Sequence, residues 1–188
     1  MLWIAWCGTR MELSTALTEE PRPGVLILAC GNPSRGDDAL GPLFMDRLAE
    51  LQEQRGGHWR DVELLTDFQL QIEHAVDLEK RALVLFIDAC VSCLPPYQFT
   101  RLQPIRDASY TSHALSPAAV LHVYQQINHA PPPPAFQLAI RGESFELGEP
   151  LSAAAETNLA AALAFVDQLF TTPQIEIWRQ FAEICENS

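Results

Sequence analysis

Residues 25–38 have the sequence VLILACGNPSRGDD, and this stretch decides the fold class. Its first six residues are all apolar, as in a short strand that is buried on both faces of a parallel sheet. The next eight form a glycine-bounded turn that leads into residues 40–51, where leucine and phenylalanine recur at helical spacing. A buried strand followed by such a turn and a helix is typical of an α/β protein and usually builds a ligand site.

The charge of this turn argues against a phosphate ligand. A phosphate-binding loop places a lysine and then a serine or threonine after its second glycine. Here Gly36 is followed by Asp37 and Asp38. Two carboxylates repel a phosphate and attract a metal ion, another cation or a proton. The sequence therefore predicts a ligand site that does not bind a nucleotide.

The remaining elements extend the alternation of strands and helices. Further strands are expected at 62–66, 82–89, 97–102 and 136–140, and helices at 68–78, 116–127 and 152–170, with a short helix near the C-terminus. The connection before the 97–102 strand is too short for a parallel crossover, so this strand should be antiparallel and near an edge. We therefore predict an α/β fold: a three-layer α/β/α sandwich with a twisted, mainly parallel sheet of about five strands, one of them antiparallel.

Length, charge and cysteine content narrow the class of protein. A chain of 188 residues is one domain by default, here residues 24–170, with a loosely ordered extension over 1–23 and a helical tail over 171–188.

The net charge of -12 disfavours nucleic acid and anionic membranes as partners, and no apolar run approaches the ~20 residues that span a bilayer. Five cysteines without regular spacing favour a reducing compartment, and we expect the cytoplasm.

Three polar residues that are far apart in the sequence are expected to meet at one edge of the sheet. Asp38 follows the first strand and Asp88 ends the most apolar one, and ligands of α/β sheets bind at the carboxyl ends of parallel strands. His113 precedes a helix that should begin at Ser116 and Pro117, and this helix starts at the same edge if the next strand is parallel. Two carboxylates and an imidazole suit a divalent ion such as Ni, Zn, Fe or Mn.

Each of these residues also has a purely structural interpretation, which the sequence leaves open. Asp38 could cap a helix or lie in its first turn, although Asp37 is the better candidate for the cap. Asp88 could accept hydrogen bonds from the following turn, and His113 alone is more often a surface residue. The pair Cys90–Cys93 has metal or redox spacing but no second pair, so two small buried thiols are the simpler interpretation.

Taken in order, the motifs resemble those of the [NiFe]-hydrogenase maturation endopeptidases. They are the turn with its following glycine (31–41), the strand end at 87–89, the segment 112–117 and the segment 142–152. The similarity spans about residues 24–170. Residues 68–74 are similar to the branch that serves bidirectional, NAD-reducing hydrogenases.

The resemblance implies a fold, an activity and a set of site residues. Members of this family have an α/β/α sandwich and remove a C-terminal peptide from the hydrogenase large subunit after nickel insertion. The nickel belongs to the precursor, and other divalent ions can substitute for it. The resemblance assigns the metal ligands to Asp38, Asp88 and His113, of which the two aspartates are also the catalytic residues. It assigns substrate contacts to Gly31, Asn32 and Asp37.

Two mechanisms and two functions remain open at this stage. A metal-polarised carbonyl or a metal-positioned water could support hydrolysis, or a carboxylate could act as the general base. The alternative to an endopeptidase is a metal-dependent binding module or chaperone that recognises the precursor without cutting it.

Overall fold

A five-stranded sheet forms the centre of the protein. The computed structural model describes residues 24–55, 57–106, 115–171 and 174–186. Its strands are β1 (Val25–Cys30), β2 (Val62–Asp67), β3 (Leu83–Cys90), β4 (Tyr97–Arg101) and β5 (Ala135–Arg141). They lie in the order β2-β1-β3-β5-β4, and all neighbours are parallel except β4, which pairs antiparallel with β5 at one edge.

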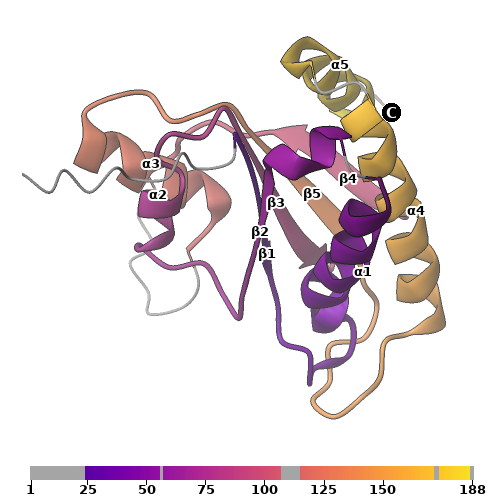
Figure 1. Ribbon diagram of the computed structural model, residues 1–188. Coiled ribbons are helices and arrows are strands. Elements are labelled where there is room, and N and C mark those ends of the chain that lie inside the picture. The colour runs from indigo at the N-terminus through magenta and orange to yellow at the C-terminus, as the bar shows by residue number, and fades with distance from the viewer. Residues whose placement is uncertain (1–23, 56, 107–114, 172–173, 187–188) are drawn as a thin grey trace, which may run out of the picture.

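Helices cover both faces of the sheet, which confirms the predicted α/β fold (Figure 1). The helices are α1 (Leu40–Arg55), α2 (His74–Asp77), α3 (Pro117–Asn128), α4 (Ala153–Thr171) and α5 (Ile175–Glu186), with short 3-10 helices η1 (Gly36–Ala39) and η2 (Gly57–Asp61). In Figure 1, α1 and α4 lie on one face of the sheet, and α2 and α3 lie on the other. No helix in the described ranges is long and apolar enough to cross a membrane.

The uniform apolarity of β1 follows from this layered arrangement. Ile27 and Ala29 join the larger core beneath α1 and α4, whereas Leu26 and Leu28 join the smaller core beneath α2 and α3. Successive side chains of a strand point to opposite faces, and both faces are covered here. Polar side chains are therefore excluded from both sides of the strand until it ends at Cys30.

The predicted helix over 68–78 is wrong for its first half, because only His74–Asp77 is helical. Backbone groups of the preceding segment, residues 68–73, form hydrogen bonds with other partners. The Leu70 carbonyl accepts a hydrogen bond from the Leu115 N–H at 3.2 Å, and the Gln71 N–H donates to the His74 Nδ1 at 2.9 Å. A segment held by such contacts cannot also form the i to i−4 ladder of a helix.

The C-terminal helix α5 packs against β4 and shares the larger core. Trp178 is fully buried and contacts the rings of Phe99 and Phe136, with centroids 6.1 and 5.6 Å away. The helical tail therefore covers the antiparallel edge of the sheet. The N-terminal extension expected over residues 1–23 lies outside the described residues.

Candidate active site

The turn after β1 holds Asp38 through its own backbone. The Asn32 N–H donates to Asp38 Oδ2 at 3.1 Å, and the Asn32 Oδ1 accepts from the Ser34 N–H at 2.9 Å. Gly31 has a φ of 148°, and a Cβ built there would lie 2.0 Å from the Asp38 carbonyl oxygen. Only glycine fits this close approach. The turn therefore fixes the Asp38 carboxylate at the carboxyl end of β1.

Asp88 lies near the end of the neighbouring strand β3 and interacts with Asp38. The pKa of the Asp88 carboxyl is raised to about 6, mainly by burial and also by the Asp38 charge, against the lowering effect of the Ala89 N–H, which donates to Asp88 Oδ1 at 2.8 Å. Asp38 lies in η1, which follows β1 and contacts β3, and β1 and β3 are hydrogen-bonded neighbours. Two of the three residues that were expected to meet at this edge, Asp38 and Asp88, therefore lie near each other, and their roles as metal ligands or catalytic groups stay predictions.

A third aspartate lies at this edge, and the sequence motifs did not point to it. Asp67 ends β2 and is paired in register with Cys30, the last residue of β1. Burial raises the pKa of the Cys30 thiol to about 12, with further contributions from the charges of Asp88, Asp67 and Asp38 in that order. Two carboxylates at the ends of β2 and β3 and one in the turn after β1 therefore act on the same thiol. The rule that pointed to Asp88, a carboxylate ending a strand, also applies to Asp67.

His74 has a partner, which the sequence did not reveal. Its ring is buried, and its Nδ1 accepts a hydrogen bond from the Gln71 N–H, so the neutral ring carries its proton on Nε2. That nitrogen lies 3.4 Å from Asp67 Oδ2. His74 thus orients the Asp67 carboxylate from the segment that follows β2.

The helix after the predicted histidine begins at the same edge as these carboxylates. The Leu115 N–H donates to the carbonyl of Leu70, just beyond the end of β2. Ser116 is the N-cap of α3, with its hydroxyl accepting from the Ala119 N–H at 3.2 Å, as expected for a serine followed by proline. His113 itself lies outside the described residues. Among those that are described, no group of three or more His, Cys, Asp or Glu side chains could hold a metal ion.

The overall arrangement matches proteins of known structure. Neither a protein-family model nor a curated protein matches the sequence. Solved structures do match. A [NiFe] hydrogenase maturation protease, HycI from Thermococcus kodakarensis KOD1, has 21% identity and a TM-score of 0.60, covering 80% of this chain and 94% of its own. The hydrogenase maturating endopeptidase HybD from Escherichia coli has 24% identity and a TM-score of 0.56, and the alignment covers 77% of this chain and 91% of HybD. An endopeptidase from Escherichia coli has 25% identity and a TM-score of 0.58, and the alignment covers 76% of this chain and 88% of that endopeptidase.

The chain has the fold of the [NiFe]-hydrogenase maturation proteases. The resemblance noted from the motifs is thereby confirmed at the level of the fold. Because the alignments cover 76–80% of this chain, the maturation-protease fold accounts for most of it.

Asp37 has a different place in the maturation-protease fold from the substrate contact that was expected. Its side chain is fully buried. Oδ2 accepts from the N–H groups of Glu143 and Ser144 and from the Ser152 hydroxyl, and Oδ1 accepts from the Ser152 N–H. Burial would raise the pKa of this carboxyl, but the hydrogen bonds from these residues together lower it. A carboxylate with four donors is fully occupied, so Asp37 holds the 143–152 segment against the turn.

Neither aspartate of the turn caps a helix. Residues Gly36–Ala39 form a 3-10 turn whose N-cap position is Arg35, without a side-chain cap, and α1 follows from Leu40. Of the other two residues expected to contact substrate, Asn32 is half-buried, whereas Gly31 is buried and donates its N–H to the Asp67 carbonyl at 3.2 Å.

Cys93, in the pair Cys90–Cys93, is a buried neutral thiol. The Cys93 N–H donates to Cys90 Sγ at 2.9 Å, and the pKa of the Cys93 thiol rises to about 12 through burial and its hydrogen bond with Cys90. A thiol with so high a pKa supplies almost no thiolate at neutral pH, and the thiolate is the nucleophile. Cys93 is buried, as the simpler interpretation of two small buried thiols expected, whereas Cys90 is only half-buried.

Proposed function

We propose that this chain is an endopeptidase that removes the C-terminal extension of a nickel-loaded [NiFe]-hydrogenase large-subunit precursor. The observation that carries the proposal is the interacting pair Asp38 and Asp88 at the carboxyl edge of a sheet with the maturation-protease fold. Structural neighbours described as maturation proteases support a role in processing.

Asp38 and Asp88 suit recognition of a cation that arrives with the substrate. Their carboxylates repel each other, so a divalent ion between them would stabilise both charged forms. Oxygen donors of this kind accept borderline divalent ions when an imidazole completes the set, and His113 is our candidate for that ligand. In this proposal nickel is part of the substrate, and the two aspartates test whether the precursor is loaded.

Hydrolysis needs an attacking water and a group that accepts its proton. The bond between carbonyl carbon and amide nitrogen breaks, the water oxygen joins the carbon, and the departing amine gains a proton. Either Asp38 or Asp88 can accept the proton of water as a general base once it is ionised. The Asn32 N–H keeps the Asp38 carboxylate oriented during these steps.

Incubation of the purified protein with loaded and nickel-free precursor tests this proposal. We expect mass spectrometry to show release of a C-terminal peptide from the loaded precursor alone. Asp38→Asn and Asp88→Asn should each lower the rate about 10³-fold, in the range for loss of acid–base and electrostatic groups. Asp46→Asn, on the exposed side of α1, is the matched control and should cut normally.

Binding of the loaded precursor without peptide release would contradict the proposal and favour the non-cleaving binding module. Normal cleavage by both site variants would contradict the assignment of Asp38 and Asp88. His113→Ala should block release as the aspartate variants do, while circular dichroism shows an unchanged fold.

A further inference from the structure

In the described part of the chain, four large apolar side chains in the loops at the carboxyl edge of the sheet are about two-thirds or more exposed. Their exposed fractions are 68% for Phe68, 66% for Val91, 73% for Leu94 and 76% for Leu147. The loops that carry them follow β2, β3 and β5; β3 carries Asp88, and β2 and β5 flank the neighbouring strands β1 and β3. We call these four residues the apolar rim. Single exposed apolar side chains are ordinary, but a group of them around a site marks a binding surface.

The turn that carries Val91 and Leu94 is anchored at Cys93. The Cys93 thiol contacts the Ala139 carbonyl at 3.7 Å, and the Cys93 carbonyl accepts a hydrogen bond from Arg141 Nη1 at 3.2 Å. Cys93 is buried, whereas the two rim residues on either side of it are exposed. The turn therefore presents apolar side chains from a backbone that is held in place.

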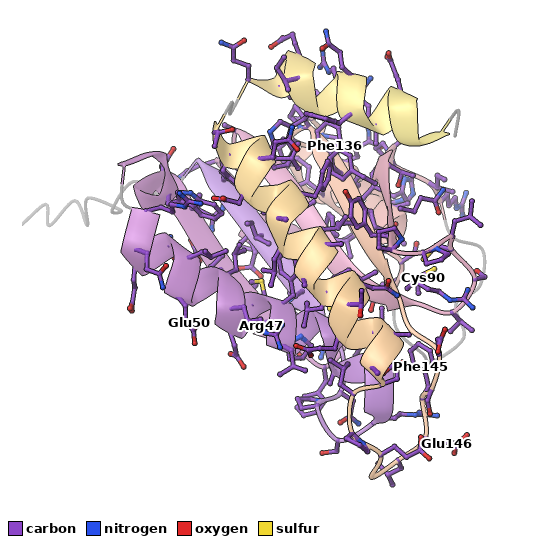
Figure 2. The ribbon with its side chains drawn as sticks, turned by 90° about the vertical axis from the view of Figure 1, so that its right-hand side faces the viewer. Arg47, Glu50, Cys90, Phe136, Phe145 and Glu146 are labelled. Atoms are coloured by element: carbon purple, nitrogen blue, oxygen red, sulfur yellow. The ribbon has the colours of Figure 1, made fainter. Side chains whose placement is uncertain are left out.

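The loop that carries Leu147 is fastened in the same way. The Gly148 N–H donates to the Ser34 carbonyl at 2.8 Å, and Arg35 Nε donates to the Phe145 carbonyl at 2.8 Å. Figure 1 shows this loop beside the turn that follows β1, and Figure 2 shows Phe145 and Glu146 at the end of the molecule opposite α5. A fixed backbone has already lost the freedom that binding would otherwise remove, so these loops can bind at low entropic cost.

The surroundings of the apolar rim are acidic. Glu143, Glu146 and Glu149 lie on either side of Leu147, and Asp38 and Asp67 are half-buried at the centre. The whole chain carries a net charge of -12. Complementary potentials favour a partner that is positively charged where it meets this edge.

We propose that the apolar rim binds the polypeptide segment next to the bond that is cut, a segment with both apolar and basic side chains. This inference rests on the proposed function, because it takes the precursor as the partner. The apolar side chains of the segment would contact Val91, Leu94 and Leu147, and its basic side chains would face the glutamates. Asp38 and Asp88 then bind the cation of the precursor while the apolar rim binds the polypeptide segment beside it.

A double variant with a matched control tests the rim. Leu94→Gln combined with Leu147→Gln removes two apolar contacts and adds no charge. Ile127→Gln is the control, because Ile127 is also exposed, at 52%. It lies at the C-terminal end of α3, whereas the N-terminal end of this helix lies at the carboxyl edge of the sheet. Steady-state cleavage of the loaded precursor gives KM and kcat, and anisotropy of a labelled precursor gives Kd for each protein.

We expect the double variant to raise Kd and KM about tenfold with kcat within about twofold, because truncated interface contacts weaken binding by this order. Ile127→Gln should match the wild type, and thermal unfolding should confirm that both variants fold. Higher ionic strength should also raise Kd, and Glu143→Gln with Glu146→Gln should weaken that dependence.

Unchanged Kd and KM in the double variant would overturn the inference. So would a wild-type dimer that the same double variant dissociates in sedimentation, since a second copy would then cover the rim. If the wild type binds the precursor without cutting it and the double variant loses binding, the proposed endopeptidase fails while the rim inference stands.

Discussion

Asp88 shows how the position of one carboxyl sets its chemistry. Its pKa of about 6 lies above the value near 3.9 of an aspartate in an unfolded chain. The folded protein therefore binds more protons between about pH 4 and pH 6. By linkage, the contribution of Asp88 to the free energy of unfolding falls as the pH rises through that window.

Asp88→Asn removes this buried charge and should stabilise the fold above the window. We expect the free energy of unfolding to rise by about 1–2 kcal/mol at pH 7.5, with the difference disappearing near pH 4. Each pKa unit by which folding raises the pKa of Asp88 corresponds to about 1.4 kcal/mol of free energy of unfolding, before solvent screening reduces it. Urea unfolding at both pH values measures it, with Asp46→Asn as control. A variant less stable than the wild type at pH 7.5 would contradict the account.

Asp37 should behave in the opposite way, because its charge is compensated. Asp37→Asn replaces one acceptor oxygen by an NH₂ group that faces existing donors, two backbone N–H groups among them. We expect a loss of about 2–4 kcal/mol, the cost of several buried groups left unpaired. Equilibrium unfolding measures the loss. Faster hydrogen exchange at residues 143–152 should accompany it, and protection equal to the wild type would argue against the tether.

At the scale of elements, the start of α3 and the packing of α5 carry the clearest tests. Ser116 caps α3 beside Leu115, whose N–H donates to the Leu70 carbonyl in the segment after β2. Ser116→Ala should cost about 1 kcal/mol, as capping residues commonly do, and Ser116→Asp should restore most of it. Thermal and urea unfolding of the three proteins provide the comparison, and equal stability of all three would refute a capping role.

Helix α5 should contribute to stability through Trp178. This side chain is fully buried, and its Nε1 has no hydrogen-bond partner within the described part of the chain. Trp178→Ala should therefore cost about 3–5 kcal/mol, whereas Trp178→Phe should cost much less because it keeps an aromatic ring and removes the unpaired N–H. If the alanine variant unfolds like the wild type, α5 does not share the core in solution.

At the scale of the whole molecule, the net charge of -12 acts on the compact state. Self-repulsion of like charges opposes folding, and salt screens it. We expect the thermal midpoint to rise by about 2–4 °C between 50 and 500 mM sodium chloride. Calorimetry measures the shift. A midpoint that falls with salt would mean that attractive ion pairs such as Arg81–Glu63 outweigh the repulsion.

The sequence by itself determined the features that depend on neighbouring residues. The apolar runs of β1 and β3 mark strands buried on both faces, and the pair Ser116-Pro117 marks the start of α3. Asp38 and Asp88 could be placed at one edge because the ends of parallel strands necessarily meet there. The motif order also led to the fold that the comparisons then showed.

Only the tertiary structure decided how residues with remote partners behave. Residues 68–73 do not form the helix that their composition favours, because the Leu70 carbonyl accepts a hydrogen bond from the remote Leu115 N–H. Asp37 becomes a tether through hydrogen bonds to Ser152, 115 positions away, and no local pattern records a partner at that distance. Hydrogen bonds depend on contact in space, so their partners are known only once the chain has folded.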